Sequence, residues 1–316
     1  MAERKQHRPG DGPYLAAIEA GGTKFNCAIF SVDGDVVAET RIPTTEPDET
    51  LSAVLAFFGQ HAEKYGPFPG AGIASFGPLD LDPASATFGS IVSTPKPGWS
   101  GTNIRNTIRE GLGTATLLDT DVNCAALAEG RFGAARDCST HCYITIGTGI
   151  GVGIIANGES LGGTTHPELG HTRLPRAPGD TYQGLCPYHE DCVEGLACGP
   201  AMADRWGERP ETLSDEHSAW DMEAHYVAAL CFNIIYTVRP EKIVIGGGVF
   251  ERKMLYGRVR QKLSGLLAGY ALTPAEQDLE SLVCAPGITE TAPGLLGAFA
   301  LAGTAAGLDR GGRHVD

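Results

Sequence analysis

The sequence predicts an α/β protein of two lobes that repeat one plan, three strands followed by alternating helices and strands (βββαβα), with a cleft between the lobes. Two observations predict this duplication. From residue 14, a strand, a Gly-Thr turn, a second strand and an Asp-Gly turn follow one another. From residue 141 the same order returns, ending at Asn157-Gly158. The length of 316 residues agrees with one large domain or two of ordinary size.

The first lobe is predicted over residues 14–120. Its strands are YLAAIEA, FNCAIF, VVAETRI, AGIASFG and TATLLDTD, with the hairpin signal VDGD after the second of them. Residues 48–66 have helical spacing, since Leu51, Val54 and Phe58 share one face and Gly66 follows as a stop. The last of these strands leads into a predicted helix, VNCAALAEGRFG.

The second lobe is predicted over residues 121–291. The expected elements are strands at 141–147, 150–156 and 242–249, a long helix at 221–238 and a helix that begins near Lys253. Residues 160–220 are rich in Gly, Pro and His and are interpreted as an irregular insertion, which in a loop this long usually carries function. A small-residue helix at 292–307 is expected to pack back on the first lobe, and residues 1–13 and 308–316 are expected to be flexible tails.

Composition excludes several classes of partner. The formal charge of −14 argues against nucleic acid or an anionic membrane, because both repel a negative surface. No apolar run approaches the roughly 20 residues of a membrane helix, and the polar N-terminus lacks a secretory h-region. The nine cysteines lie mostly alone in apolar segments, which is typical of a reducing cytoplasm, so a disulfide between Cys186 and Cys192 is not expected.

Two glycine turns are candidate phosphate sites. EAGGTKF (19–25) joins two strands, which excludes the Walker and dinucleotide motifs because both need a helix after the glycines. Its backbone N–H groups can still converge on an anion, and Thr23 and Lys24 add donors. IGTGIGVG (146–153) repeats the device. Either turn alone is equally well read as an ordinary hairpin, but two at matching places favour a polyphosphate ligand.

Asp121 stands where a strand meets a helix, in LLDTDVN. From the residue alone, a helix N-cap is the favoured interpretation. Asp119 and Thr120 are neighbouring acceptors, so the cap does not require Asp121.

Six motifs in one order resemble the ROK family of sugar kinases and repressors. They are EAGGT, TDVNCAALAE, TIGTGIGVG, HPELGH, CPYHEDCVEGLACGPA and IVIGGGV, and the resemblance spans about residues 14 to 300. The resemblance implies the two-lobed actin-like ATPase (ribonuclease H-like) fold. Glu19 in EAGGTKF, TPKPGW (94–99) and the CxxHxxC pattern are similar to bacterial ROK fructokinases, whereas most ROK glucokinases have Asp in place of Glu19.

The resemblance also implies roles for individual residues. Asp121 would accept the proton of the sugar hydroxyl that attacks the γ-phosphate of ATP, a step to which a base adds about 10²–10⁴-fold. Thr120 departs from the Asn of many glucokinases and weakens a transfer of their sugar contacts. The residues implied for ATP are Gly21, Gly22, Thr23, Lys24, Thr148, Gly149, Pro200, Gly246, Gly247 and Gly248. Mg²⁺ is expected with ATP near Asp121 and the EAGGT loop.

A structural zinc is expected in the insertion, over residues 160–200. His171, Cys186, His189 and Cys192 provide the four thiolate and imidazole ligands of a closed tetrahedral site, as in the fructokinase branch. Two alternatives remain open: His189 as a surface histidine, and Asp191 as a competing ligand. Glu168 and Glu194 flank these ligands and, by resemblance, accept hydrogen bonds from sugar hydroxyls. The glycine turns lie elsewhere in the sequence and are expected to be independent of the metal.

The expected activity is ATP-dependent phosphorylation of D-fructose to fructose 6-phosphate by a homodimer. A glucokinase or an amino-sugar kinase of the same family is the nearest alternative. ROK repressors carry a DNA-binding domain before EAGGT, and the 18 residues that precede Glu19 are too few for one. A non-catalytic sugar sensor is the alternative of a different class, and it requires that Asp121 is not a base.

Overall fold

The computed structural model describes residues 12–308, which form two compact units. Unit 1 runs through Ala128 and also contains Gly162–His166 and the residues from Glu290, and unit 2 contains Glu129–Leu161 and Pro167–Thr289. Apart from residues 12, 13 and 308, the predicted tails lie outside the described residues. The lobe limits predicted from the sequence stay a prediction.

A mixed five-stranded sheet forms the centre of unit 1, in the order β3-β2-β1-β4-β5. Its strands are β1 Tyr14–Ala20, β2 Lys24–Ser31, β3 Val36–Pro43, β4 Gly70–Ser75 and β5 Ala115–Thr120. The first three are antiparallel, whereas β1, β4 and β5 are parallel. The predicted Gly-Gly turn between β1 and β2 and the predicted Asp-Gly turn between β2 and β3 therefore each close a β-hairpin.

Helices cover both faces of this sheet. Alternate residues of β1 divide between them: Ile18 packs with α1 (Pro47–Tyr65) and α2 (Ile104–Leu112), and Ala17 packs with α10 (Pro293–Ala305). The helix α10 lies very close to β4, since a Cβ at Gly72 would come within 1.9 Å of the Ala298 carbonyl oxygen. This proximity explains the small residues of α10.

The sheet of unit 2 repeats the plan, in the order β10-β9-β6-β7-β8. Its strands are β6 His141–Ile146, β7 Ile150–Ala156, β8 Glu159–Ser160, β9 Lys242–Gly246 and β10 Val283–Cys284. The strands β6 to β8 are antiparallel, and β6, β9 and β10 are parallel, as are their counterparts in unit 1. The predicted duplication is confirmed.

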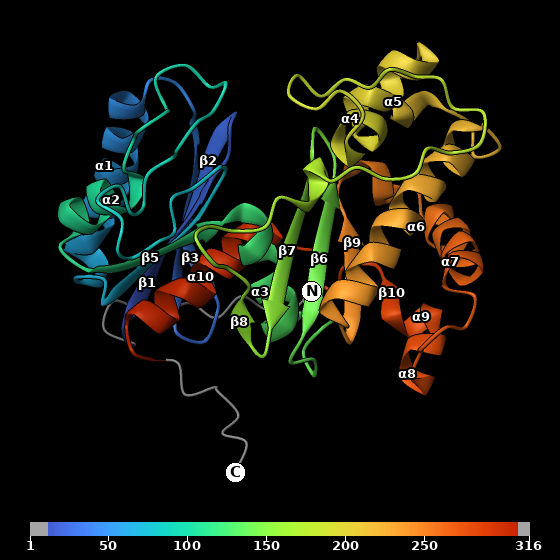
Figure 1. Cartoon of the computed structure of the whole chain (residues 1–316). Helices are drawn as coiled ribbons and strands as arrows, with labels where there is room; N and C mark the ends of the chain where they lie inside the picture. Colours follow the sequence, from blue (N-terminus) through green and yellow to red (C-terminus); the bar gives the residue numbers. More distant parts are fainter. Residues whose placement is uncertain (1–11, 309–316) are drawn as a thin grey trace. The chain divides into compact units, whose positions relative to one another are not determined.

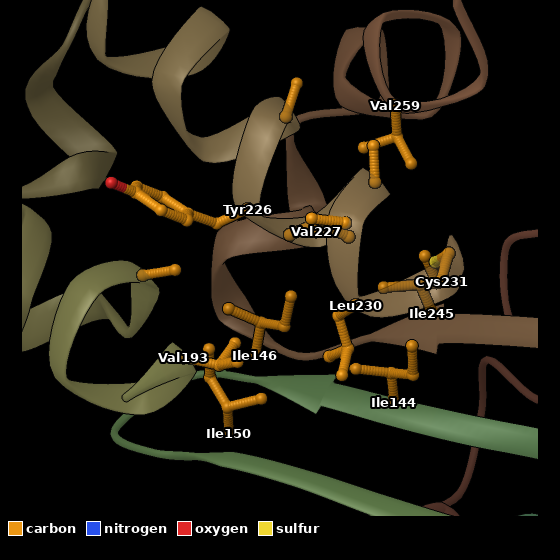
Figure 2. Close-up of a cluster of buried hydrophobic side chains, with 14 of the residues drawn as sticks. Ile144, Ile146, Ile150, Val193, Tyr226, Val227, Leu230, Cys231, Ile245 and Val259 are labelled. Atoms are coloured by element: carbon orange, nitrogen blue, oxygen red, sulfur yellow. The ribbon is translucent and has the colours of Figure 1, made fainter. Parts of the chain in front are cut away.

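Within unit 2, the helices α6 (Ala219–Val238) and α7 (Met254–Leu267) pack together beside the sheet (Figure 1). Their apolar side chains meet those of β6, β7 and β9 in one core, in which Ile144, Leu230 and Ile245 are labelled in Figure 2. The short helices α8 (Pro274–Gln277) and α9 (Leu279–Leu282) precede β10.

The insertion at 160–220 is more ordered than the sequence indicated. It contains α4 (Val193–Ala197), α5 (Gly199–Trp206) and the 3₁₀ turns η1 (Leu169–His171) and η2 (Pro210–Thr212). The prediction of an irregular segment was wrong here because Cys192 and Pro200 begin helices that are too short to show a clear period. None of the helices in residues 12–308 combines the length and apolar character needed to cross a bilayer.

Candidate active site

The first glycine turn (residues 20–24) joins β1 to β2. The N–H of Gly21 donates to the carbonyl of Lys24 at 3.0 Å, and a Cβ at Gly21 would lie 2.8 Å from that oxygen. Thr44, which directly follows β3, holds the turn: its hydroxyl donates to the Gly21 carbonyl at 2.7 Å and its N–H to that of Thr23 at 3.0 Å. Gly22, Thr23 and Lys24 are exposed.

Glu19 stands at the end of β1, just before this turn. Its carboxylate accepts a hydrogen bond from the Asn26 side chain at 2.5 Å. Burial raises the pKa of Glu19, while Asn26 and Lys24 lower it. From the sequence alone, no catalytic or binding role was assigned to Glu19. An acid near the end of a buried strand, just before two glycines, nevertheless indicates a functional carboxylate.

The junction of β5 and α3 (Asp121–Phe132) is capped by Thr120. Its hydroxyl accepts from the N–H of Asn123 at 3.1 Å, and Asp119 accepts from the Thr120 N–H at 2.7 Å. Asp121 is half-buried, and its Oδ1 accepts from the adjacent N–H of Val122 at 2.9 Å. The alternative that Asp121 is needed as the helix cap is therefore removed.

The charges of three carboxylates of unit 1 act on Cys124. Burial raises the pKa of this thiol well above its usual range, and the charges of Asp119, Asp121 and Glu19 raise it further. Three acids thus lie close enough to act on one sulfur atom. Glu19, which precedes the predicted phosphate turn, and Asp121, the predicted base, therefore act on the same thiol.

The second glycine turn (residues 146–150) joins β6 to β7 in unit 2. The N–H of Gly147 donates to the carbonyl of Gly149 at 3.0 Å, and Thr148 is exposed at its tip. The N–H of Gly199, which precedes the exposed Pro200, donates to the Gly147 carbonyl at 2.8 Å. The turn is thereby attached to the start of α5.

The glycine shelf (residues 246–248) lies against the same turn. Gly247 has φ 93°, and a Cβ there would come within 2.4 Å of the Ile146 carbonyl oxygen. A Cβ at Gly147 would lie 4.0 Å from the Gly248 nitrogen, and open space surrounds Gly248 itself. Three segments predicted to bind ATP are therefore brought together in unit 2: the turn, the shelf and the residues at Pro200.

Four side chains of the metal loop (residues 168–194) form a cluster. The ligand atoms of His171, Cys186, His189 and Cys192 all lie within 4.8 Å of one another. The Nδ1 atom of His171 is 3.7 Å from the Cys186 sulfur and 3.6 Å from the Cys192 sulfur. Bonds of about 2.3 Å for Zn–S and 2.0–2.1 Å for Zn–N give a tetrahedron whose S···N edge is about 3.5 Å, so the donors fit zinc.

The backbone around this cluster is tightly folded. Cys186 and Glu190 exchange two backbone hydrogen bonds, of 2.9 and 3.3 Å, and Glu190 has φ 55°. A Cβ at Gly184 or Gly195 would lie 2.1 or 1.9 Å from the Glu190 carbonyl oxygen, so both positions require glycine. The local fold therefore turns His189 back towards Cys186, at 3.8 Å between Nδ1 and Sγ.

Asp191 is engaged in ion pairs. Its two carboxylate oxygens lie 3.5 Å from Arg173 Nε and 3.1 Å from Arg176 Nη2. The competing-ligand alternative loses support, because these arginines hold the carboxylate, and the described metal cluster does not include it.

The two proposed sugar acids lie on segments that pack together. Glu168 is exposed just before η1, which contacts α4, and Glu194 is half-buried in the first turn of α4. The N–H of Val193 donates to the Thr172 carbonyl at 2.9 Å, joining the segments.

Glu194 also contacts the second glycine turn. Its Oε2 accepts a hydrogen bond from the N–H of Ile150 at 3.0 Å. In the sequence this turn is separate from the metal loop, whereas the structure joins the two by a hydrogen bond between residues 44 positions apart. Independence of the turn from the metal itself stays a prediction.

Comparison with known proteins agrees with these motifs. The model of the ROK family matches residues 15–305. The chain belongs to the ROK family. A "Putative fructokinase" of Bacillus subtilis is 40% identical over 289 residues, covering 91% of this chain and 95% of that protein. A "Fructokinase" of Pediococcus pentosaceus is 40% identical over 264 residues, covering 84% and 90%. A "Glucokinase" of Halalkalibacterium halodurans is 26% identical over 276 residues, covering 75% and 80%.

Solved structures share the ROK fold. A ROK hexokinase from Thermus thermophilus has a TM-score of 0.76 at 24% identity, covering 94% of this chain and 100% of that one. A ROK family transcriptional regulator, a homologue of the E. coli MLC protein, has a TM-score of 0.74 at 21% identity, covering 94% and 79%. The ROK fold is therefore the actin-like ATPase type, with two mixed sheets, and by itself it does not separate kinases from regulators.

Proposed function

We propose that this ROK protein transfers the γ-phosphoryl group of ATP to the 6-hydroxyl of D-fructose. The observation that carries the proposal is the meeting of Gly147, Gly199 and Gly248 in unit 2, beside the carboxylate of Glu194. Glycine backbone can approach a nucleotide without a Cβ in the way, and carboxylates accept hydrogen bonds from sugar hydroxyls. Relatives named fructokinase, at 40% identity, support fructose as the sugar.

In the proposed reaction, the 6-hydroxyl oxygen of fructose attacks the γ-phosphorus, the bond to the ADP oxygen breaks, and Asp121 accepts the hydroxyl proton. The capping of α3 by Thr120 supports this role, since it makes Asp121 unnecessary for the helix start. Gly21, Gly22, Thr23 and Lys24 are proposed to bind phosphate, together with Thr148 and Gly149. Mg²⁺ would neutralise phosphate charge, and Glu19 joins Asp121 as a candidate residue in its neighbourhood.

The metal loop is proposed to hold zinc through His171, Cys186, His189 and Cys192. Four protein ligands leave no open position, so the ion would contribute folding free energy and would not take part in phosphoryl transfer. Its effect would be to fix the segments that carry Glu168 and Glu194. A homodimer also remains a proposal, which light scattering of the purified protein would test.

Initial rates with ATP·Mg²⁺ and a panel of free hexoses test the function. We expect the highest kcat/KM with fructose, with lower values for mannose and glucose. A preference for glucose or for an amino sugar would identify the same-family alternative. Sugar binding by calorimetry without turnover of any hexose would identify a sensor and contradict the kinase assignment.

A further inference from the structure

Glu194 occupies a position between two parts of unit 2 that the proposed function treats separately. It lies two residues after the cluster residue Cys192, and one of its carboxylate oxygens is bonded to the N–H of Ile150. Ile150 is the first residue of β7 and follows Gly149 directly. A single carboxylate therefore belongs both to the metal loop and to the support of the second glycine turn.

The contact leaves little room for adjustment. A Cβ at Gly149 would lie 2.6 Å from Glu194 Oε2, so the turn and the carboxylate are packed against each other. On the other side of the contact, a Cβ at Gly170 would lie 1.9 Å from the Ile150 carbonyl oxygen. Gly170 directly precedes the cluster residue His171. The N–H, the carbonyl and the preceding residue of Ile150 are thus all confined by the metal loop.

Apolar packing supports the same junction. Val193, the residue before Glu194, belongs to the core that contains Ile146 and Ile150, the two ends of the turn. Figure 2 shows these three side chains grouped together below Tyr226. Because Val193 is fully buried, a displacement of α4 would disturb both strand ends as well as the hydrogen bond.

We propose that Glu194 is a positioning residue for the nucleotide as well as a sugar ligand. Its Oε2 holds the N–H of Ile150 and so fixes the second glycine turn, while Oε1 is directed to a sugar hydroxyl. The sugar and the nucleotide then both depend on the Glu194 carboxylate. Binding of either ligand orders this carboxylate for the other. This coupling rests on the proposed function and extends it, because it assigns to Glu194 an effect on nucleotide affinity in the absence of sugar.

Three variants of the full-length, zinc-loaded protein separate the two roles. Glu194→Ala removes both, and we expect its affinity for AMPPNP·Mg²⁺, measured by calorimetry without sugar, to fall about ten- to a hundredfold, as for a lost hydrogen bond to a charged acceptor. Glu194→Gln keeps a carbonyl oxygen for Ile150 and should bind AMPPNP within about twofold of wild type, although its fructose KM rises. Glu168→Ala, the matched control, should raise the fructose KM and leave AMPPNP affinity unchanged.

Variants in the second glycine turn test the reverse effect, that of the turn on fructose binding. Gly149→Ala pushes on Glu194 and should raise the fructose KM at saturating ATP, whereas Gly147→Ala, whose Cβ meets no atom of Glu194, should leave this KM unchanged. Neither glycine variant changes a residue of the metal loop. The pair therefore tests the coupling even if Glu194→Ala loses zinc or has a lower Tm.

Wild-type AMPPNP affinity in a folded Glu194→Ala protein, or equal fructose KM values for the two glycine variants, would overturn the coupling and leave the kinase assignment intact. If wild type phosphorylates no hexose, the proposed function fails instead, and the AMPPNP measurements still report on the coupling.

Discussion

The two glycine turns occupy equivalent places in the duplicated sheets, yet they are supported differently. The first turn is held by Thr44, at the end of the adjacent strand β3 in its own sheet. The second turn is held by Glu194 and Gly199, which belong to the insertion. The hairpin is thus the same in both sheets, but among the described residues only the second copy forms hydrogen bonds with residues of the insertion. We therefore expect the two turns to respond differently to changes in the insertion.

The largest effect is expected where neither turn is altered. Asp121→Asn should lower kcat by about 10²–10⁴, the usual contribution of a positioned base, because the amide cannot accept the hydroxyl proton. AMPPNP and fructose affinities should stay near wild type, since Thr120 caps α3. Steady-state kinetics and calorimetry measure both quantities. A kcat close to that of wild type would remove Asp121 from the mechanism.

The second-largest effect is expected when the metal is removed, which should affect the two glycine turns differently. Purified protein should contain one zinc per chain by elemental analysis, and Cys186→Ser should lose it and melt earlier, because a structural zinc contributes folding free energy. Fructose affinity should then fall strongly and AMPPNP affinity moderately, since Glu194 also supports the second turn.

The half-buried Cys138 lies outside the metal cluster, and Cys138→Ser is the matched control that should keep its zinc. Full activity of a metal-free wild-type protein would contradict the structural role. Unchanged AMPPNP affinity after zinc loss would show that the second turn is as independent as the first.

A smaller effect is expected at the first turn. Thr44→Val removes the hydroxyl bonded to the Gly21 carbonyl and should weaken AMPPNP binding a few-fold, comparable with the loss of one hydrogen bond of about 1 kcal/mol. Fructose KM at saturating ATP should not change, in contrast to Gly149→Ala. Thr44→Ser keeps the hydroxyl and serves as control. A clear rise in fructose KM for Thr44→Val would contradict the difference drawn between the turns.

The smallest effect on activity is expected at a buried acid of unit 2, where the change is one of stability. Burial raises the pKa of Glu223 to about 8, with Arg205 acting in the opposite direction, and its Oε1 has no hydrogen-bond partner among the described residues. An acid with a raised pKa in the folded state costs no stability below its unfolded pKa, and stability falls as pH rises through the folded value.

Glu223→Gln should therefore have a higher Tm than wild type at pH 8.5, and the difference in Tm should be smaller at pH 5.5. Each kcal/mol gained in the free energy of unfolding raises the Tm by about 2–4 °C. Thermal melts at the two pH values measure this. A variant that is stabilised equally at both values would show that titration of Glu223 is not the cause.

The sequence by itself determined the repeated plan and the chemistry of the candidate groups. Strand alternation, the hairpin at Asp33-Gly34 and the helical spacing of Leu51, Val54 and Phe58 are local signals, so they survive in one dimension. The His and Cys residues of the metal loop were likewise recognisable, because their spacing and type already match zinc.

Only the tertiary structure decided which partners these groups have. The hydrogen bond from Ile150 to Glu194 joins residues 44 positions apart, and Arg176 reaches Asp191 across a folded loop. The first contact lies where α4 and η1 pack together, with Val193 buried and no side chain at Gly170. A carboxylate has no periodicity that reveals its donor, so the hydrogen bond between Glu194 and Ile150 appears only when the chain has folded.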